Sequence, residues 1–300
     1  MGISIYNVKR WTKMLTGKSI YHVDQNLGKV FEPGQLKGYF NDMTQKVLMG
    51  DKNLDEKGIP FLEHSDGSHV QMPTMIFQYG LGAYDLWVIR KEIEYFNKAK
   101  RCADWAIDHQ EDNGAWSVFF YIYPNAPYSA MPQGEAVSLL VRIYKETQDE
   151  KYLSAAEKAI KFMLTDVRDG GVCKCNDFNL ILLEYTHLPL VRNGWIFALF
   201  GLYDYFLLTG EYEDKFKKSV NSLEKALVHF DCGYWSMYDE VGKIASPFYH
   251  NLHIAQMKAL YMVTKKEIFN ECAERFERYQ KNRLNELRAF AKKVMQKLRD

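Results

Sequence analysis

The chain has 300 residues, and its 39 lysine and arginine side chains nearly balance its 38 aspartate and glutamate side chains. The formal charge of +1 gives the molecule no long-range field of the kind that marks a nucleic-acid-binding protein. Hydrophobic residues make up 47% of the chain, which indicates a globular protein and excludes a disordered or fibrous one. No apolar run has the length of a membrane span or a signal peptide. As written, the sequence predicts a cytoplasmic protein or a piece of a longer one.

Aromatic residues are frequent, with 20 tyrosines and 18 phenylalanines. The flat face and polar tip of tyrosine match the C–H face and hydroxyl edge of a sugar ring, although a large helical core would use the same residues. The five cysteines are odd in number and scattered, so we expect reduced thiols. Cys173 and Cys175 have no second pair at zinc-ligand spacing, which favours a structural hairpin over a metal site.

Residues 1–72 mix a short helix with turns that are marked by glycine and aspartate. We expect this N-terminal segment to pack on the remainder of the chain and to close one side of it. Residues 73–300 are expected to form the catalytic domain. No linker rich in Gly, Pro or Ser separates the two parts, so we predict a single structural unit.

A repeat of about sixty residues begins near Pro73. Four helical segments align on a tyrosine, at intervals of 60, 59 and 58 residues, and positions four and seven residues before each tyrosine have helical spacing. A second periodic segment follows each first one through a short polar turn, so each repeat is predicted to be a helical hairpin. The repeated tyrosines, which we expect in the core, are Tyr84, Tyr144, Tyr203 and Tyr261.

Between the hairpins lie segments rich in glycine and aromatic residues, which are typical of short strands or extended loops. A proline follows each segment shortly before the next helix, and such loops would emerge at the same end of a ring of hairpins. We therefore predict a mainly α fold, an incomplete (α/α) toroid of repeated helical hairpins with short β-hairpins and loops at the active-site end.

The C-terminal segment, residues 283–300, has the pattern of an amphipathic helix. Its apolar face would include Leu284, Leu287, Ala291, Val294 and Leu298, with basic residues elsewhere. A helix that binds a membrane surface or a partner helix has this pattern. A terminal helix that packs its apolar stripe on the body has it too, and this second interpretation is the expected one.

Loops that should meet at the open end of the toroid carry an unusual set of polar residues. Phenols, carboxylates, imidazoles and one arginine together suit acid–base chemistry on an anionic sugar. The candidate residues are Gln133, Glu135, Glu184, Tyr185, His187, Arg192, Asn193, Tyr238, Asp239, Tyr249, His250 and His253.

Some of these candidates also have a structural interpretation. His250 and His253 are spaced i, i+3, but no third ligand stands at a recognised spacing, so we predict no metal; one histidine should bind substrate and the other should belong to the core. Glu135 is expected in the first turn of a helix, where the helix dipole alone would favour it. Tyr238 and Tyr249 break the helical periodicity and lie in turns, which favours a functional role.

Four segments, MPQGEAVSLLVRIY, NGWIFALFGLYDY, SMYD and YHNLHIAQMKAL, resemble the C-terminal catalytic domain of the D-glucuronyl C5-epimerases. The resemblance covers about residues 78–256. It implies an isomerase that inverts C5 of glucuronic acid in a heparosan- or heparan-sulfate-like polysaccharide, giving iduronic acid without a cofactor. In the animal proteins, the segment that resembles SMYDEV carries an arginine where Val241 stands here.

Carried over by motif, the resemblance implies four catalytic residues, Glu184, Tyr185, Tyr238 and Tyr249. The C5 proton lies alpha to a carboxylate, so its removal develops charge that must be stabilised. Inversion needs one group on each face of the ring, and we assign Glu184 and Tyr249 to these faces in an order left open. Tyr185 and Tyr238 would hold the substrate carboxylate or stabilise the enolate-like intermediate. Substrate-binding roles are expected for Gln133, Arg192, Asn193, His250 and His253.

Two other functions remain open at this point. A uronate polysaccharide lyase begins with the same proton abstraction and is found on the same fold, and a non-catalytic carbohydrate-binding protein would bind polymer without chemistry. In each case the expected partner is an anionic polysaccharide and not a nucleic acid. By analogy with the family, a homodimer could clamp a long polymer.

Overall fold

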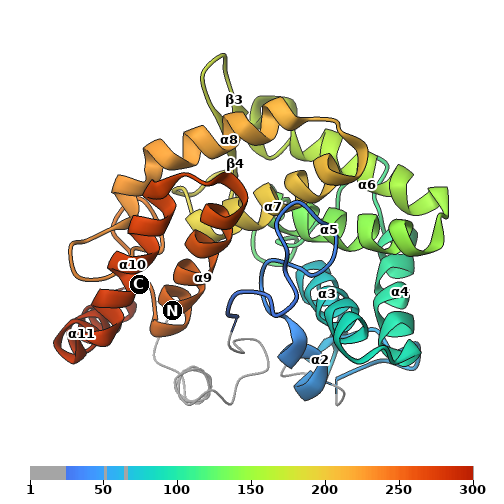
Figure 1. Ribbon diagram of the computed structural model, residues 1–300, viewed down its shortest axis with the longest axis horizontal. Helices are drawn as coiled ribbons and strands as arrows, with labels where there is room; N and C mark the ends of the chain where they lie inside the picture. The colour runs from blue at the N-terminus through green and yellow to red at the C-terminus, as the bar shows by residue number, and fades with distance from the viewer. Residues whose placement is uncertain (1–24, 51–52, 64–66, 300) are drawn as a thin grey trace.

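The structure is a computed structural model, and it describes residues 25–50, 53–63 and 67–299. Four helical hairpins follow one another along an open arc, with the first helix of each hairpin on the inner side and the second on the outer side (Figure 1). This arrangement confirms the predicted incomplete (α/α) toroid. The inner helices are α3 (Pro73–Arg90), α5 (Ala130–Thr147), α7 (Arg192–Thr209) and α9 (Pro247–Thr264). The outer helices are α4 (Ile93–Asp108), α6 (Glu150–Met163), α8 (Glu213–Ala226) and α10 (Glu267–Lys281).

Local sequence signals explain where the inner helices begin and end. Pro73 and Pro247 occupy the first turn of their helices, and Ser129 and Ser246 accept a backbone N–H as N-caps. Each inner helix ends in a residue with left-handed backbone, whose N–H bonds back to a carbonyl of the last turn. These residues are Lys91, Gln148, Gly210 and Lys265.

All four repeated tyrosines lie on the inner helices, but they do not occupy the same position in each helix. Tyr84 and Tyr203 are the twelfth residues of their helices, whereas Tyr144 and Tyr261 are the fifteenth, about one turn later. Tyr84 and Tyr203 are buried as predicted. Tyr144 and Tyr261 are only partly buried and pack against the edge of the core, so the predicted core position holds only in part for these two. Measured between the first residues of the inner helices, the repeats span 57, 62 and 55 residues.

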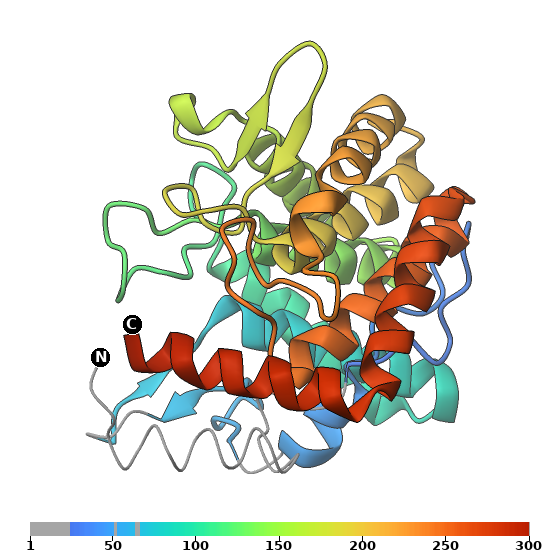
Figure 2. The same cartoon turned by 90° about the vertical axis from the view of Figure 1, so that its left-hand side faces the viewer.

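The long connections between hairpins gather on one side of the molecule, as the green, yellow and orange loops of Figure 2 show. They include an antiparallel hairpin of β3 (Cys173–Cys175) and β4 (Leu180–Leu182), in which Cys173 pairs with Leu182. The structural hairpin expected at these cysteines is therefore confirmed, and all five thiols are free. A second antiparallel pair joins β1 (Leu62–Glu63) to β2 (His69–Val70).

Helices α5 and α7 pack with their backbones in close contact. A Cβ added to Gly201 would lie well under 3.0 Å from the backbone of Gly134, and one added to Gly134 would meet the backbone of Ala198. Nearer the C-terminal ends of the same two helices, Arg142 and Asp204 form a buried ion pair with Nη1 and Oδ2 2.6 Å apart. Small residues and a paired charge therefore fix the distance between the two central helices.

The described part of the N-terminal segment packs against these central helices. It includes α2 (Thr44–Gly50), and the ring of Phe40 stacks on that of Phe200 with centroids 3.8 Å apart. Arg142 donates to the carbonyl of Gly38, and Asp85 accepts from the backbone N–H of Tyr39. These contacts attach the described part of residues 1–72 to the helical arc. Residues 1–24, 51–52 and 64–66 lie outside the described part, and the division of the chain at residues 72 and 73 stays a prediction.

The C-terminal helix α11 (Arg283–Arg299) lies on the outside of the arc, in the foreground of Figure 2. Ala289 is buried against Tyr234, Trp235 and Ile244, but the predicted apolar stripe faces away from the body. Leu284 is 76% exposed, so the expectation that the stripe packs on the body was wrong. Among the described residues, no helix has the length and apolarity needed to cross a bilayer.

The contact between α5 and α7 can be tested with Gly201→Ala. Alanine favours a helix over glycine by up to about 1 kcal/mol, but its Cβ would overlap the backbone of Gly134. We expect the cost of this overlap to exceed the gain in helix propensity, so that the free energy of unfolding measured by urea denaturation falls by about 1–3 kcal/mol. Ser154→Ala at an exposed position of α6 is the control and should change stability little. A Gly201→Ala variant as stable as the control would show that the helices can separate without cost.

Candidate active site

The four residues predicted to be catalytic come together at the loop side of the arc. Glu184 and Tyr185 follow β4, Tyr238 lies in the loop before α9, and Tyr249 is the third residue of α9. The hydroxyl of Tyr238 lies 3.5 Å from Oε1 of Glu184, at the outer limit of a hydrogen bond. The rings of Tyr238 and Tyr249 meet edge to face with centroids 4.9 Å apart. One carboxyl group thus lies beside a group of three phenols.

Glu184 is buried, and its carboxyl group lies at the N-terminus of α7. The backbone N–H of Gly194, the third residue of that helix, and the hydroxyls of Tyr185 and Tyr238 are the donors that favour its charged form, although its Oε2 has no hydrogen-bond partner among the described residues. A Cβ at position 194 would lie well under 3.0 Å from Oε2, so only glycine leaves room for the carboxyl group. Burial raises the pKa of Glu184 from 4.5 to about 7, and these three donors limit the rise.

The three tyrosines are partly buried, so their hydroxyls stand between the core and the solvent. Burial and the neighbouring carboxyl of Glu184 raise the pKa of both Tyr185 and Tyr238 well above the usual 10. The ring of Tyr185 stacks on Phe119 with centroids 4.7 Å apart, and Tyr123 packs on its edge. Both phenols are therefore protonated at neutral pH and can donate hydrogen bonds to an anion.

The turn that carries Tyr238 is fixed from both sides. The backbone N–H of Tyr238 donates to the carbonyl of Lys243, and Oδ1 of Asp239 accepts from the N–H of Lys243 at 2.8 Å. A short bridge between Val191 and Asp239 ties the turn to the residue before α7. Asp239 is therefore a structural organiser of the site. Val241 at the tip of the turn is 66% exposed.

Helix α11 holds the other side of the same turn. Gln296 accepts from the N–H of Ile244 at 3.0 Å and donates to the carbonyl of Gly242 at 2.7 Å. Lys293 donates to the carbonyl of Ile244, and its Nζ lies 5.6 Å from the centre of the Tyr238 ring. The inner face of α11 thus supports the loop of a candidate catalytic residue, which the sequence pattern did not indicate.

His250 and His253 belong to the core. Both are completely buried, and their Nδ1 atoms lie 2.8 and 2.9 Å from the same hydroxyl, that of Ser236. His250 also contacts the carbonyl of Phe276 through Nε2 and stacks on Trp235. Burial lowers the pKa of both histidines, that of His250 to about 4, so both are neutral. The expectation that one of them faces the substrate does not match this placement. The sequence shows the spacing of the two histidines but not the direction in which their side chains point.

Three more residues with an expected substrate-binding role are buried. Gln133 donates to the carbonyls of Trp116 and Ser129 and accepts from the N–H of Trp116, so its amide is fully used. Arg192 is completely buried, with the rings of Phe230 and Phe276 5.3 and 5.2 Å from its guanidinium carbon. Burial lowers the pKa of Arg192 to about 10.

Asn193 follows Arg192 in the first turn of α7, and its backbone carbonyl accepts from Gln256 at 3.1 Å. Only 3% of Asn193 is exposed. The structure places these two residues, together with Gln133, behind the site and not on its surface. Helical periodicity places residues on the same turn, but it could not show that this turn points into the core.

Glu135, which the sequence suggested has a structural role, is a completely buried carboxyl group. It lies in the second turn of α5, not the first, so the dipole interpretation was wrong. Gln78 donates to its Oε1 at 2.7 Å, and burial raises the pKa of Glu135 to about 8. The charge on Glu184 contributes to this rise, whereas Lys46 of α2 opposes it. Glu135 is thus a second buried carboxyl group with a raised pKa, and it lies close enough to Glu184 for their charges to interact.

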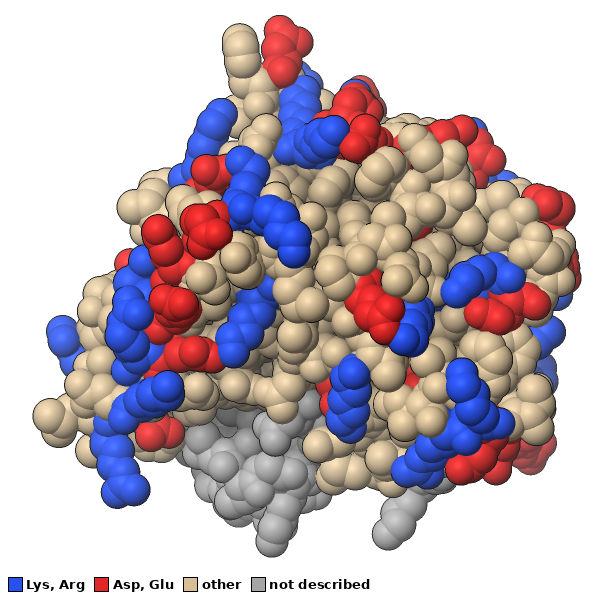
Figure 3. Space-filling model, in the orientation of Figure 1, with Lys and Arg blue, Asp and Glu red and all other residues tan. Residues whose placement is uncertain are grey.

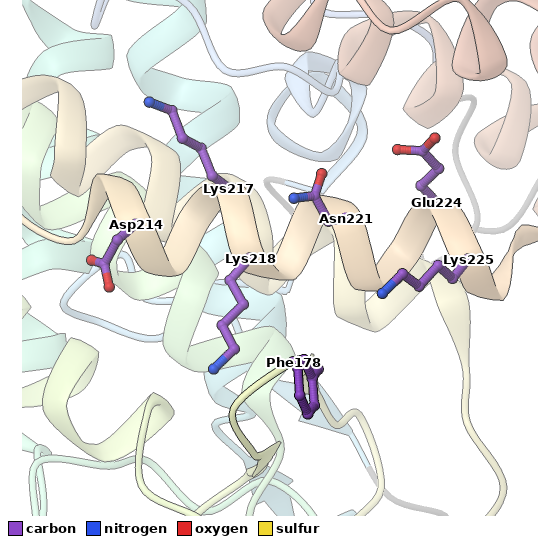
Figure 4. A pocket seen from close by; sticks show the side chains of 7 residues that line it. All are labelled: Phe178, Asp214, Lys217, Lys218, Asn221, Glu224 and Lys225. Carbon is purple, nitrogen blue, oxygen red and sulfur yellow. The ribbon is translucent and has the colours of Figure 1, made fainter.

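A separate groove of about 450 Å³ lies on the outer side of the arc, between α8 and the tip of the β3–β4 hairpin (Figure 4). None of the four predicted catalytic residues lines it. Among the described residues, no three His, Cys, Asp or Glu side chains are grouped to hold a metal ion. The groove is lined by Phe178, Asp214, Lys217, Lys218, Asn221, Glu224 and Lys225.

The raised pKa of Glu184 predicts a specific pH dependence. Because the folded state holds its proton up to about pH 7 and the unfolded state releases it near 4.5, burying this group costs stability increasingly between these values. In Glu184→Gln, this cost is absent. We therefore expect the free energy of unfolding of Glu184→Gln, relative to wild type, to rise with pH in this window, by up to about 1.4 kcal/mol per unit. Urea denaturation at several pH values measures this dependence, and Glu157→Gln, at a more exposed position, is the control. If the free energy of unfolding of both variants, relative to wild type, changed equally with pH, Glu184 would not be a buried, protonated carboxyl group.

Comparison with known proteins identifies a family over the part of the chain that contains the candidate site. A family described as "D-glucuronyl C5-epimerase C-terminus" matches residues 94–278. The D-glucuronyl C5-epimerase of Caenorhabditis elegans is 31% identical over 205 residues, which are 58% of this chain and 33% of that protein. An uncharacterized protein of Methanocaldococcus jannaschii is 32% identical over 148 residues, which are 47% of this chain and 48% of that one. The chain therefore spans about a third to a half of these relatives.

Solved structures support the fold. A cellobiose 2-epimerase from Bacillus thermoamylovorans superposes with a TM-score of 0.58, covering 79% of this chain and 69% of that one, at 14% identity. At this identity the likeness concerns the arrangement of helices alone. Because the family match extends over more than half of the chain and includes all four clustered residues of the candidate site, the chain belongs to the family of D-glucuronyl C5-epimerase C-terminal domains.

Proposed function

We propose that this protein inverts C5 of glucuronic acid units in an anionic polysaccharide. The observation that carries the proposal is the cluster of one buried carboxyl group and three partly buried phenols at the loop side of the arc. Family membership supports the reaction type. The reaction needs a group that can take a proton and donors for an anion, and the cluster offers both.

Glu184 is proposed as one of the two proton-transfer groups. A carboxyl group with a pKa of about 7 is divided between its two protonation states near neutral pH, so it can accept a proton in one direction of the reaction and return it in the other. The close packing of Gly194 against the carboxyl group fixes the position of that group while its charge changes.

Tyr249 is proposed as the proton-transfer group on the opposite face of the sugar ring. It lies in the first turn of α9, where the backbone dipoles favour negative charge on a nearby group. Tyr185 and Tyr238 hold their protons firmly, which suits them to donate hydrogen bonds to the substrate carboxylate as charge develops on it.

The buried polar residues have supporting roles in this proposal. Arg192 and Asn193 form the first turn of α7, which presents the N–H of Gly194 to Glu184. His250 and His253, bridged by Ser236, connect the segment before the Tyr238 turn to α9. Gln133 fixes the start of α5 against the loop at Trp116. Substitution of these residues should reduce stability or turnover more than polymer binding.

The proposal predicts that Tyr249→Phe loses catalysis and keeps binding. Without the phenolic proton, one face of the sugar can be neither protonated nor deprotonated, so formation of the C5-inverted sugar in D₂O should fall by at least about 100-fold, and any deuterium that enters through Glu184 should retain the starting configuration. NMR after incubation with heparosan and other glucuronate polymers measures it, and polymer affinity should change little. Tyr144→Phe, which loses a hydroxyl at a hairpin turn far from the cluster in sequence, is the control and should remain active.

The same spectra separate the alternatives. A lyase would give an unsaturated sugar with a C4–C5 double bond, and a binding protein would give neither exchange nor a new product. Full inversion at C5 in Tyr249→Phe would contradict the assignment of this residue, whereas absence of exchange in the wild type with every polymer would contradict the proposed reaction.

A further inference from the structure

Helix α11 presents a continuous apolar stripe to the solvent. Its side chains recur at helical spacing, so they share one face of the helix. Their exposed fractions range from 42% at Val294 to 76% at Leu284, which is far from the burial of a packed core helix. The exposed members of the stripe are Leu284, Leu287, Ala291, Val294, Met295 and Leu298.

The opposite face of the same helix is fixed to the body. Ala289 is buried in a small apolar cluster, and Lys293 and Gln296 make hydrogen bonds to the backbone of residues 242–244. Rotating the helix to bury its stripe would break all these contacts. The exposed stripe is therefore a property of the docked helix.

Positive charge is concentrated on this helix. Residues 283–299 contain six lysine and arginine side chains and one acidic side chain, a net charge of +5, whereas the whole chain carries +1 and the remainder therefore −4. On the helical projection, Arg288 and Lys292 border the apolar stripe on one side and Arg283 borders it on the other. Figure 3 shows blue side chains at the lower left, where α11 lies in Figure 1.

An apolar stripe with basic borders matches an anionic lipid surface. Apolar side chains enter the boundary between headgroups and acyl chains, while lysine and arginine remain among the headgroups. Pairing of this face with a second copy would instead bring two helices of net charge +5 together. From this charge complementarity, we propose that α11 docks the protein on membranes that contain anionic lipid, lying in the plane of the surface without crossing it.

Docking through the outer face leaves the inner face of α11 in place. Gln296 and Lys293, which support the turn of Tyr238, do not belong to the stripe. The protein can therefore bind a membrane and keep its candidate active site intact. The inference does not depend on the reaction proposed above.

Sedimentation of the full chain with vesicles tests the docking. We expect binding to vesicles of phosphatidylcholine with phosphatidylserine, weaker binding at high salt, and little binding to phosphatidylcholine alone. The double variant Leu287→Ser and Val294→Ser should weaken binding at least 10-fold, and Arg283→Gln with Lys292→Gln should weaken it mainly at low salt. Because Leu287, Val294 and Arg283 are exposed and Lys292 is only partly buried, thermal unfolding should change little.

Phe178→Ser and Lys217→Gln provide matched controls, since they remove an exposed apolar group and a charge at the groove beside α8. Both should bind vesicles like the wild type. Absence of vesicle binding, or binding that the α11 variants do not weaken, would overturn the proposal. A dimer in light scattering that the Leu287→Ser and Val294→Ser variant dissociates would assign the stripe to a second copy instead, and would also overturn it.

Discussion

The close contact between α5 and α7 is the constraint on which the rest of the structure depends. Gly134 and Gly201 let the two backbones touch, and the buried pair of Arg142 and Asp204 fixes them in register. Because α7 is held so firmly, its first turn can present a backbone N–H to Glu184 at a defined place. The candidate site is therefore built on the most rigid part of the arc, as precise positioning of a reactive group requires.

Burial of ionisable groups connects this architecture to chemistry. The same core that accepts the Arg142–Asp204 pair also encloses Glu135 and Glu184, and neither of these carboxyl groups has a cation close enough to keep its pKa low. Such groups reduce stability at neutral pH, yet a carboxyl group that exchanges protons near pH 7 has to be buried in this manner. The three tyrosines add hydrogen-bond donors that stay protonated beside it.

The sequence predicted the hairpins well because apolar spacing directly reflects which face of a helix is buried. The alignment on tyrosines shifted two of the repeats by one helical turn. A tyrosine can be buried in the middle of a helix, as Tyr84 is, or lie near its end with the hydroxyl group exposed, as Tyr144 does. Tyr238 and Tyr249 were singled out because they break periodicity, although Tyr249 lies in the first turn of α9 and not in a loop, whereas His250 and Arg192 look functional in sequence and lie in the core. Exposure of the α11 stripe could not be predicted, since the pattern is the same for a helix turned either way.

An open arc, unlike a closed ring, has a first and a last hairpin, and each of these packs against one neighbouring hairpin instead of two. Local stability should therefore decline from the α5–α7 centre toward the ends of the arc. Glu184 is attached to the centre and Tyr249 to the last hairpin. A sugar bound between them would join a rigid unit to a more mobile one, so substrate binding and the ordering of the last hairpin are thermodynamically coupled.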